Sequence, residues 1–179
     1  MKQVYLDYNA TTPVRPEVVQ AMLPFFNETF ANPASPHKPG RLAEVARMRG
    51  SRQISNLINA APSEIIITSG GTESDNLAIL GAANHAAVKN KKQIITTSVE
   101  HSASYESCRH LEATGFDVVY LKVDRSGMID LDELKSTISD QTALVSIILA
   151  NNETGTIQDY QAIKKIMEKH DVPLHYDAV

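Results

Sequence analysis

The sequence predicts an α/β fold, with a mostly parallel sheet that carries helices on both faces. Two observations lead to this fold class. After residue 60, apolar runs of strand length alternate with amphipathic runs of helix length, and the apolar runs are almost uninterrupted. Alternating strands and helices indicate βαβ crossover connections between parallel strands. Strands that are apolar throughout are typical of a sheet that is covered on both faces.

The first 60 residues have a different pattern, with little sign of a sheet. Residues 1–7 suit a short extended arm, and Pro16 suits the first turn of a helix over residues 18–30. The run from 32 to 40 is rich in Asn, Pro, Ser and Gly, so we expect a loop there. The following residues, 41–59, predict a second amphipathic helix.

Five strands are predicted after this region, because each of five short runs is apolar or β-branched and borders a turn former or a polar segment. These runs are Ile65–Thr68, Ile94–Thr97, Val118–Val123, Leu144–Leu149 and Pro173–Val179.

Four helices are predicted between the strands, because the intervening segments place apolar residues at helical spacing. Gly115 suits the C-cap of the second of these helices, and Asp130 suits the N-cap of the third. The four segments are Thr72–Val88, Ser102–Thr114, Leu131–Ile138 and Tyr160–His170.

Composition narrows the class of protein. The chain has 179 residues, of which 42% are hydrophobic, so a folded core is expected and disorder is excluded as the main state. Its formal net charge of −4 argues against bulk electrostatic binding to nucleic acid. A single cysteine excludes an internal disulfide framework and any multi-cysteine metal site. The sequence shows neither a membrane span nor a secretory signal, which predicts a cytoplasmic protein.

Polar segments follow four of the five predicted strands, or lie within them. In an open parallel sheet, ligands bind at the carboxyl ends of the strands. We therefore expect these segments to meet at one edge of the sheet and to form a ligand site. The segments are Ser69–Asn76, Val99–Ser102, Ala150–Gly155 and His175–Asp177.

The first two segments each allow more than one interpretation. Gly70, Gly71 and Thr72 open a helix, so their N–H groups form either an anion site or an ordinary strand-to-helix turn. His101 is either structural, a general base, a metal ligand or a ring that stacks on a flat cofactor. No second His or Cys stands at ligand spacing, so the metal interpretation is disfavoured and no metal is predicted.

The last two segments are ambiguous as well. Asp177 lies in an apolar strand, where a carboxylate needs either a cation or loop N–H groups as partners. The run Asn151–Glu153 is either a simple turn or a source of amide groups. Taken together, a phosphate cradle, a ring to stack on, a carboxylate and an amide suit pyridoxal 5'-phosphate, which has a phosphate, a pyridine nitrogen and a phenolic oxygen.

At this point several motifs resemble the cysteine desulfurases, which are pyridoxal-phosphate enzymes of the class-V aminotransferase group with fold type I architecture. The resemblance spans the chain from its first residues to its last. The motifs are Tyr5–Pro13, Asn32–Ser35, Thr68–Ala78, Glu100–His101, Asn151–Gly155 and His175–Val179.

The resemblance implies a role for each matching residue. Gly71 and Thr72 would hold the phosphate of the cofactor, and His101 would stack on its pyridine ring and assist proton transfer as the catalytic residue. Asn152 would bind the phenolic oxygen, and Asp177 would pair with the pyridine nitrogen. A loop near the substrate would contain Asn9, Ala10 and Thr11.

The resemblance also implies a reaction and its partners. Cysteine desulfurases convert L-cysteine to L-alanine and pass persulfide sulfur to an acceptor or scaffold protein, for iron–sulfur cluster assembly or thiolation. They form homodimers. A related class-V enzyme, such as a selenocysteine lyase, is an alternative, and so is a short non-catalytic binding or assembly partner.

The members that the chain resembles are about twice as long. Their cofactor-anchoring lysine, their persulfide cysteine and an arginine for the substrate carboxylate match positions beyond Val179. We therefore expect residues 1–14 to form an arm that associates with the small domain, and residues 15–179 to form an incomplete large domain that is inactive by itself. Cys108 falls within a predicted helix, so we interpret it as a structural thiol and not as a sulfur carrier.

Overall fold

The computed structural model describes residues 3–179, and its contacts divide the chain into two units, Met1–Ile67 and Thr68–Val179. Each unit is described by itself. Residues 3–7 have no regular secondary structure, while Met1 and Lys2 of the predicted arm lie outside the described residues. The predicted division after residue 14 stays a prediction.

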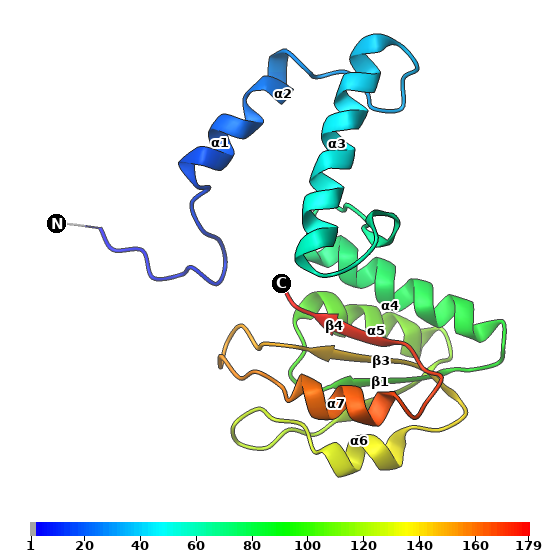
Figure 1. Cartoon of the computed structure of the whole chain (residues 1–179). Helices are drawn as coiled ribbons and strands as arrows, with labels where there is room; N and C mark the ends of the chain where they lie inside the picture. Colours follow the sequence, from blue (N-terminus) through cyan, green and yellow to red (C-terminus); the bar gives the residue numbers. More distant parts are fainter. Residues whose placement is uncertain (1–2) are drawn as a thin grey trace. The chain divides into compact units, whose positions relative to one another are not determined.

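The first unit contains four helical segments: α1 (Pro16–Met22), α2 (Pro24–Asn27), α3 (Lys38–Leu57) and the 3₁₀ helix η1 (Pro62–Glu64) (Figure 1). The predicted single helix over residues 18–30 is therefore wrong. Pro24 has no N–H group and its ring clashes with the preceding turn, so the helix is interrupted and restarts at this proline.

The predicted loop from residue 32 to residue 40 ends earlier than expected, because α3 already begins at Lys38. The His37 ring caps this helix, as its Nδ1 accepts a hydrogen bond of 3.2 Å from the Gly40 N–H group. A Cβ atom at position 40 would lie 2.4 Å from the Ser35 carbonyl oxygen. Only glycine permits this close approach between the loop and the first turn of α3.

The second unit is a parallel sheet of four strands in the order β2-β1-β3-β4. Every pair of neighbouring strands is parallel, as predicted. The strands are β1 (Gln93–Thr97), β2 (Asp117–Leu121), β3 (Thr142–Ile148) and β4 (Leu174–Asp177).

Four helices cover the sheet, with α4 and α5 on one face and α6 and α7 on the other (Figure 1). This arrangement confirms the prediction of helices on both faces. The Asp130 carboxylate caps α6 as predicted, because it accepts hydrogen bonds from the N–H groups of Asp132 and Glu133. The helices are α4 (Gly71–Ala87), α5 (Ser102–Ala113), α6 (Leu131–Thr137) and α7 (Tyr160–Met167).

The predicted strand Ile65–Thr68 is wrong, because these residues form no regular element. Ile66 and Ile67 are 71% and 58% exposed, and no strand of residues 3–179 pairs with them. β-branched residues favour strands mainly because they pack well on a pleated, half-buried surface. Without such a surface beside them, the preference has no effect here.

The two faces of the sheet differ in chemistry. Against α6 and α7, the strands contribute an apolar layer that includes Ile95, Val145 and Ile147. Against α4 and α5, the layer is apolar at first, with Ile94 and Leu144, but becomes polar toward the carboxyl ends of the strands. Among the described residues, no helix is both long enough and apolar enough to cross a membrane.

Candidate functional site

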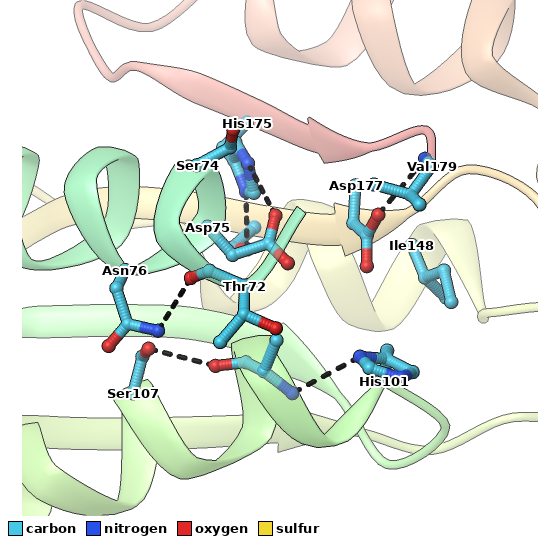
Figure 2. A network of polar contacts seen from close by, with 12 residues as sticks. Thr72, Ser74, Asp75, Asn76, His101, Ser107, Ile148, His175, Asp177 and Val179 are labelled. Carbon is cyan, nitrogen blue, oxygen red and sulfur yellow. Dashed lines mark hydrogen bonds and ion pairs between the residues drawn. The ribbon is translucent and has the colours of Figure 1, made fainter. Parts of the chain in front are cut away.

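The amino end of α4 lies at the carboxyl edge of the sheet. Gly70 is the N-cap residue, and no side chain of residues 3–179 caps the helix. The first N–H groups of a helix lack intrahelical partners and carry the positive end of its dipole. Gly71 lies beside Val179, since a Cβ atom at position 71 would be 2.8 Å from the Val179 Cγ2 atom. The Thr72 side chain, which is exposed, lies in the same turn (Figure 2).

The turn before α4 is held by its own side chains. The Glu73 carboxylate accepts hydrogen bonds of 2.7 and 2.6 Å from the Ser69 N–H and hydroxyl groups. These bonds lower the pKa of Glu73. The hydroxyls of Thr68 and Ser74 lie 2.7 Å apart and close the turn from the other side. The turn therefore presents the helix N-terminus in one fixed orientation, as an anion site requires.

His101 is the N-cap residue of α5, at the end of the loop that follows β1. Its Nδ1 atom accepts a hydrogen bond of 3.2 Å from the Ala103 N–H group (Figure 2). An accepting Nδ1 carries no proton, so a neutral His101 ring has its proton on Nε2. The hydrogen bond also fixes the ring at the edge of the sheet, where the stacking role was predicted.

Asp177 ends β4 and is 5% exposed. Its Oδ1 atom accepts a hydrogen bond of 3.2 Å from the Val179 N–H group. Among the ion pairs of the described residues, none gives Asp177 a lysine or arginine partner. A buried carboxylate without a cation is costly, so this position favours a ligand that brings a positive charge.

Asn151 and Asn152 have different environments in the structure. Asn151 is buried, and its Oδ1 atom accepts from the N–H groups of Glu153 and Thr154 while its Nδ2 atom donates to the Val99 carbonyl oxygen. Asn151 therefore holds two loops together. Asn152 is exposed in the turn after β3, and its Nδ2 atom donates to Glu153 Oε1 at 3.2 Å.

The predicted substrate loop lies in the first unit. Asn9 and Ala10 belong to a turn in which the Ala10 N–H group donates to the Asp7 carbonyl oxygen at 3.3 Å, and Thr11 follows it. All three residues are exposed. Their role toward a substrate stays a prediction.

Sequence reasoning gave no role to three acid–base residues near the site, of which one is buried and two are partly buried. Asp75 on α4 is 3% exposed, and its pKa is raised to about 6, mainly by burial and then by Asp177. Glu100 follows β1, and burial raises its pKa to about 7. His175 lies two residues before Asp177, and burial lowers its pKa. One signal for Asp75 was available, because it lies four residues before Ile79 and eight before Ala83, on the buried side of α4.

Cys108 lies within α5 and is fully buried, and its pKa is raised to about 12, chiefly by burial. A buried thiol of this kind is not a nucleophile. The interpretation of Cys108 as structural is therefore supported. Over residues 3–179, no group of three His, Cys, Asp or Glu side chains is arranged to hold a metal ion.

The residues present fit pyridoxal 5'-phosphate. The uncapped helix N-terminus suits a phosphate, the fixed His101 ring suits a flat heterocycle, and the buried Asp177 carboxylate suits a protonated ring nitrogen. A parallel α/β domain with these groups at one edge is typical of the fold type I class.

The chain belongs to the aminotransferase class-V family, whose model matches residues 4–179. Among curated proteins, it is 49% identical over 178 residues to "Cysteine desulfurase IscS" of Dictyoglomus turgidum, covering 99% of this chain and 45% of that protein. It is 47% identical over 178 residues to the protein of the same name from Methanosarcina thermophila, covering 99% of this chain and 44% of that protein.

Solved structures agree with this assignment. A "NIFS-LIKE PROTEIN" matches with a TM-score of 0.95 and 38% identity, covering 99% of this chain and 49% of that chain. "SspA in complex with cysteine" matches with a TM-score of 0.91 and 38% identity, covering 96% of this chain and 49% of that chain. The chain thus spans less than half the length of these relatives and corresponds to their amino-terminal part.

Proposed function

We propose that this chain is the amino-terminal, cofactor-binding part of a pyridoxal-phosphate-dependent cysteine desulfurase. The observation that carries the proposal is the meeting of three groups at one sheet edge: the α4 N-terminus, the His101 ring and the buried Asp177 carboxylate. The names of the similar proteins support the proposal from an independent direction.

In this proposal, each site residue contacts a different part of the cofactor. Gly71 and Thr72 bind the phosphate through backbone N–H groups and a hydroxyl. The His101 ring stacks on the pyridine face, and Asn152 donates to the phenolic oxygen. Asp177 holds a proton at the pyridine nitrogen, because a nearby carboxylate favours the charged form of that nitrogen.

When bound, the cofactor supplies an electron sink for the bonds around the α-carbon of an amino acid. The chain's own residues orient it and set its charge. His101 has a second function in this proposal. With Nδ1 engaged by the Ala103 N–H group, its Nε2–H group is the one that can exchange a proton with a substrate.

For the whole protein, we propose that L-cysteine is converted to L-alanine in the cytoplasm and that persulfide sulfur passes to an acceptor or scaffold protein for iron–sulfur cluster assembly or thiolation. The intact protein is a homodimer in this proposal. Residues 1–14 form an arm associated with a small domain, and residues 15–179 belong to the large domain. Asn9, Ala10 and Thr11 then contribute to the substrate side of the pocket.

Cofactor binding by the 179-residue chain tests the proposal directly. Equilibrium dialysis with pyridoxal 5'-phosphate should show saturable binding that inorganic phosphate weakens by competition. Asp177→Asn removes a charge-assisted contact and should weaken binding roughly tenfold or more. Asp140→Asn, in an exposed turn before β3, is the matched control and should leave binding unchanged. Equal affinity of wild type and Asp177→Asn would contradict the assigned role of this carboxylate.

The substrate is tested with the product of the gene that encodes the chain. Alanine and sulfide release from L-cysteine would support a desulfurase. Faster turnover of L-selenocysteine, with none of L-cysteine, would instead indicate a selenocysteine lyase.

A further inference from the structure

Three polar side chains lie under the candidate site, between the sheet and α4. The His175 Nδ1 atom is 2.9 Å from the Ser146 hydroxyl oxygen on the neighbouring strand. The His175 Nε2 atom is 3.6 Å from Asp75 Oδ1 on α4 (Figure 2). Both ring nitrogens therefore face a polar group, and the Asp75 and His175 side chains are 4% and 16% exposed.

This network is not needed to complete the hydrophobic core. His175 and Asp177 point to the same face of β4, since side chains alternate along a strand. Tyr176 and Leu174 point to the other face and pack into the apolar layer beneath α6 and α7. In register with them, β3 places Ser146 opposite His175. Burying an acid and an imidazole costs free energy that two apolar residues would not.

The geometry limits how Asp75 and His175 can be protonated. At 3.6 Å, the two groups attract each other when His175 is charged and Asp75 is ionised. A neutral His175 beside a protonated Asp75 has the same total charge. The other two protonation states, ionised Asp75 with neutral His175 and protonated Asp75 with charged His175, leave one isolated charge, and burial disfavours them. The pair therefore gains and loses its first proton as one coupled unit.

Several titratable groups face this pair. Asp177 lies on β4 itself, His101 caps α5, and Glu100 follows β1. Asp177 raises the pKa of Asp75, whereas His101 and the Ser104 hydroxyl on α5 lower it. Asp177 also raises the pKa of His175 against the larger lowering effect of burial. Among residues 3–179, Asp177 is thus the neighbour whose charge raises the pKa of both members of the pair.

We propose that the buried Asp75–His175 pair is coupled to Asp177 through its charge, and that the proton the pair holds responds to any cation that binds Asp177. The inference rests on the proposed function, in which that cation is a protonated pyridine nitrogen. Once the charge of Asp177 is balanced, it repels an ionised Asp75 less strongly. A larger fraction of the pairs is then deprotonated near pH 6, and the released protons pass to solvent.

The coupling is measured first on the chain without cofactor. Carboxyl and imidazole NMR titrations give the pKa values of Asp75 and His175 in wild type and in Asp177→Asn. We expect Asp177→Asn to lower the Asp75 pKa by about one unit, a tenfold change in proton affinity, and to lower the His175 pKa as well. Ser107→Ala is the control, because this buried hydroxyl on α5 donates to the Ala103 carbonyl oxygen and should change neither value.

A second arm uses Asp75→Asn, with far-UV circular dichroism to check folding. Calorimetry of pyridoxal 5'-phosphate binding in two buffers of different ionisation enthalpy should show proton release near pH 6 in wild type and its loss in Asp75→Asn. The first arm needs no Asp75 variant, so the inference remains testable if Asp75→Asn does not fold.

The outcomes separate the two proposals. An Asp75 pKa that is the same in wild type and Asp177→Asn would overturn the coupling, whatever the cofactor does. Coupled titrations in a chain that does not bind pyridoxal 5'-phosphate would support the coupling and overturn the proposed function. Cofactor binding with equal proton release in wild type and Asp75→Asn would assign the proton to another group and overturn the role of the pair.

Discussion

Glu100 offers a sharp test of the electrostatics at the sheet edge. Its Oε1 atom accepts hydrogen bonds from the Thr97 hydroxyl at 2.7 Å and from the Ile148 N–H group at 2.9 Å. Its Oε2 atom is buried and has no hydrogen-bond partner among the described residues. Burial is the main cause that raises the Glu100 pKa from 4.5 to about 7. The perturbation is Glu100→Gln, which preserves the shape and the acceptor but cannot ionise.

The expected magnitude follows from proton linkage. A carboxyl with a raised pKa in the folded state contributes stability that is fully present below pH 4.5 and is lost as pH rises through about 7. One pKa unit corresponds to about 1.4 kcal/mol. Between pH 5 and pH 8, the two pKa values of Glu100 give a loss of about 2–3 kcal/mol in the free energy of unfolding.

The assay is urea denaturation, followed by circular dichroism, of wild type and Glu100→Gln at pH 5 and pH 8. The loss of stability between the two pH values should be about 2–3 kcal/mol smaller in Glu100→Gln than in wild type. A constant penalty from the new amide cancels in this comparison. Glu106→Gln, an exposed change on α5, should behave like wild type. Equal pH dependence in wild type and Glu100→Gln would refute the argument that Glu100 is held in a low-dielectric position.

Three further outcomes are expected. The Cys108 thiol, fully buried and with its pKa raised to about 12, should react with an aromatic disulfide reagent at pH 8 only after urea unfolds the chain; rapid reaction of the native chain would contradict its burial. Ile147→Ala removes a fully buried side chain from β3 and should lower the free energy of unfolding by about 2–5 kcal/mol in urea denaturation, whereas a change below about 1 kcal/mol would be inconsistent with a packed layer. Asp130→Ala deletes the α6 cap and should cost about 1 kcal/mol in the same measurement, with Asp140→Ala, in an exposed turn, as a comparison that should cost little.

The sheet was predictable because its strands are defined locally. In β3, all seven residues are buried, and the nearly continuous apolar run that contains this strand is visible in the sequence. The amphipathic helices between strands could be recognised in the same way, by their 3.6-residue period. The run Ile65–Thr68 had the same local signal but forms no strand, because strand formation also needs a neighbouring strand, which local sequence does not specify.

For the candidate site, the carboxyl-edge rule for parallel sheets predicted where the segments with Gly71, Thr72, His101, Asn152 and Asp177 would lie, and the family resemblance implied their individual roles, which stay predictions. The sequence pattern did not show that Asn151 has a structural role. Burial and four hydrogen bonds made by Asn151 assign it to holding the loops, and this follows only from the fold.

The sequence by itself therefore determined the α/β class, the parallel direction of the strands and the resemblance to the class-V aminotransferase group, because periodicity and motifs are local properties of the chain. Only the tertiary structure decided which acids and imidazoles are buried together. Asp75 and His175 are 100 residues apart, yet β4 and α4 place them 3.6 Å from each other. Their proton affinities depend on burial and on the charge of Asp177, which are properties of the assembled sheet edge and not of either segment alone.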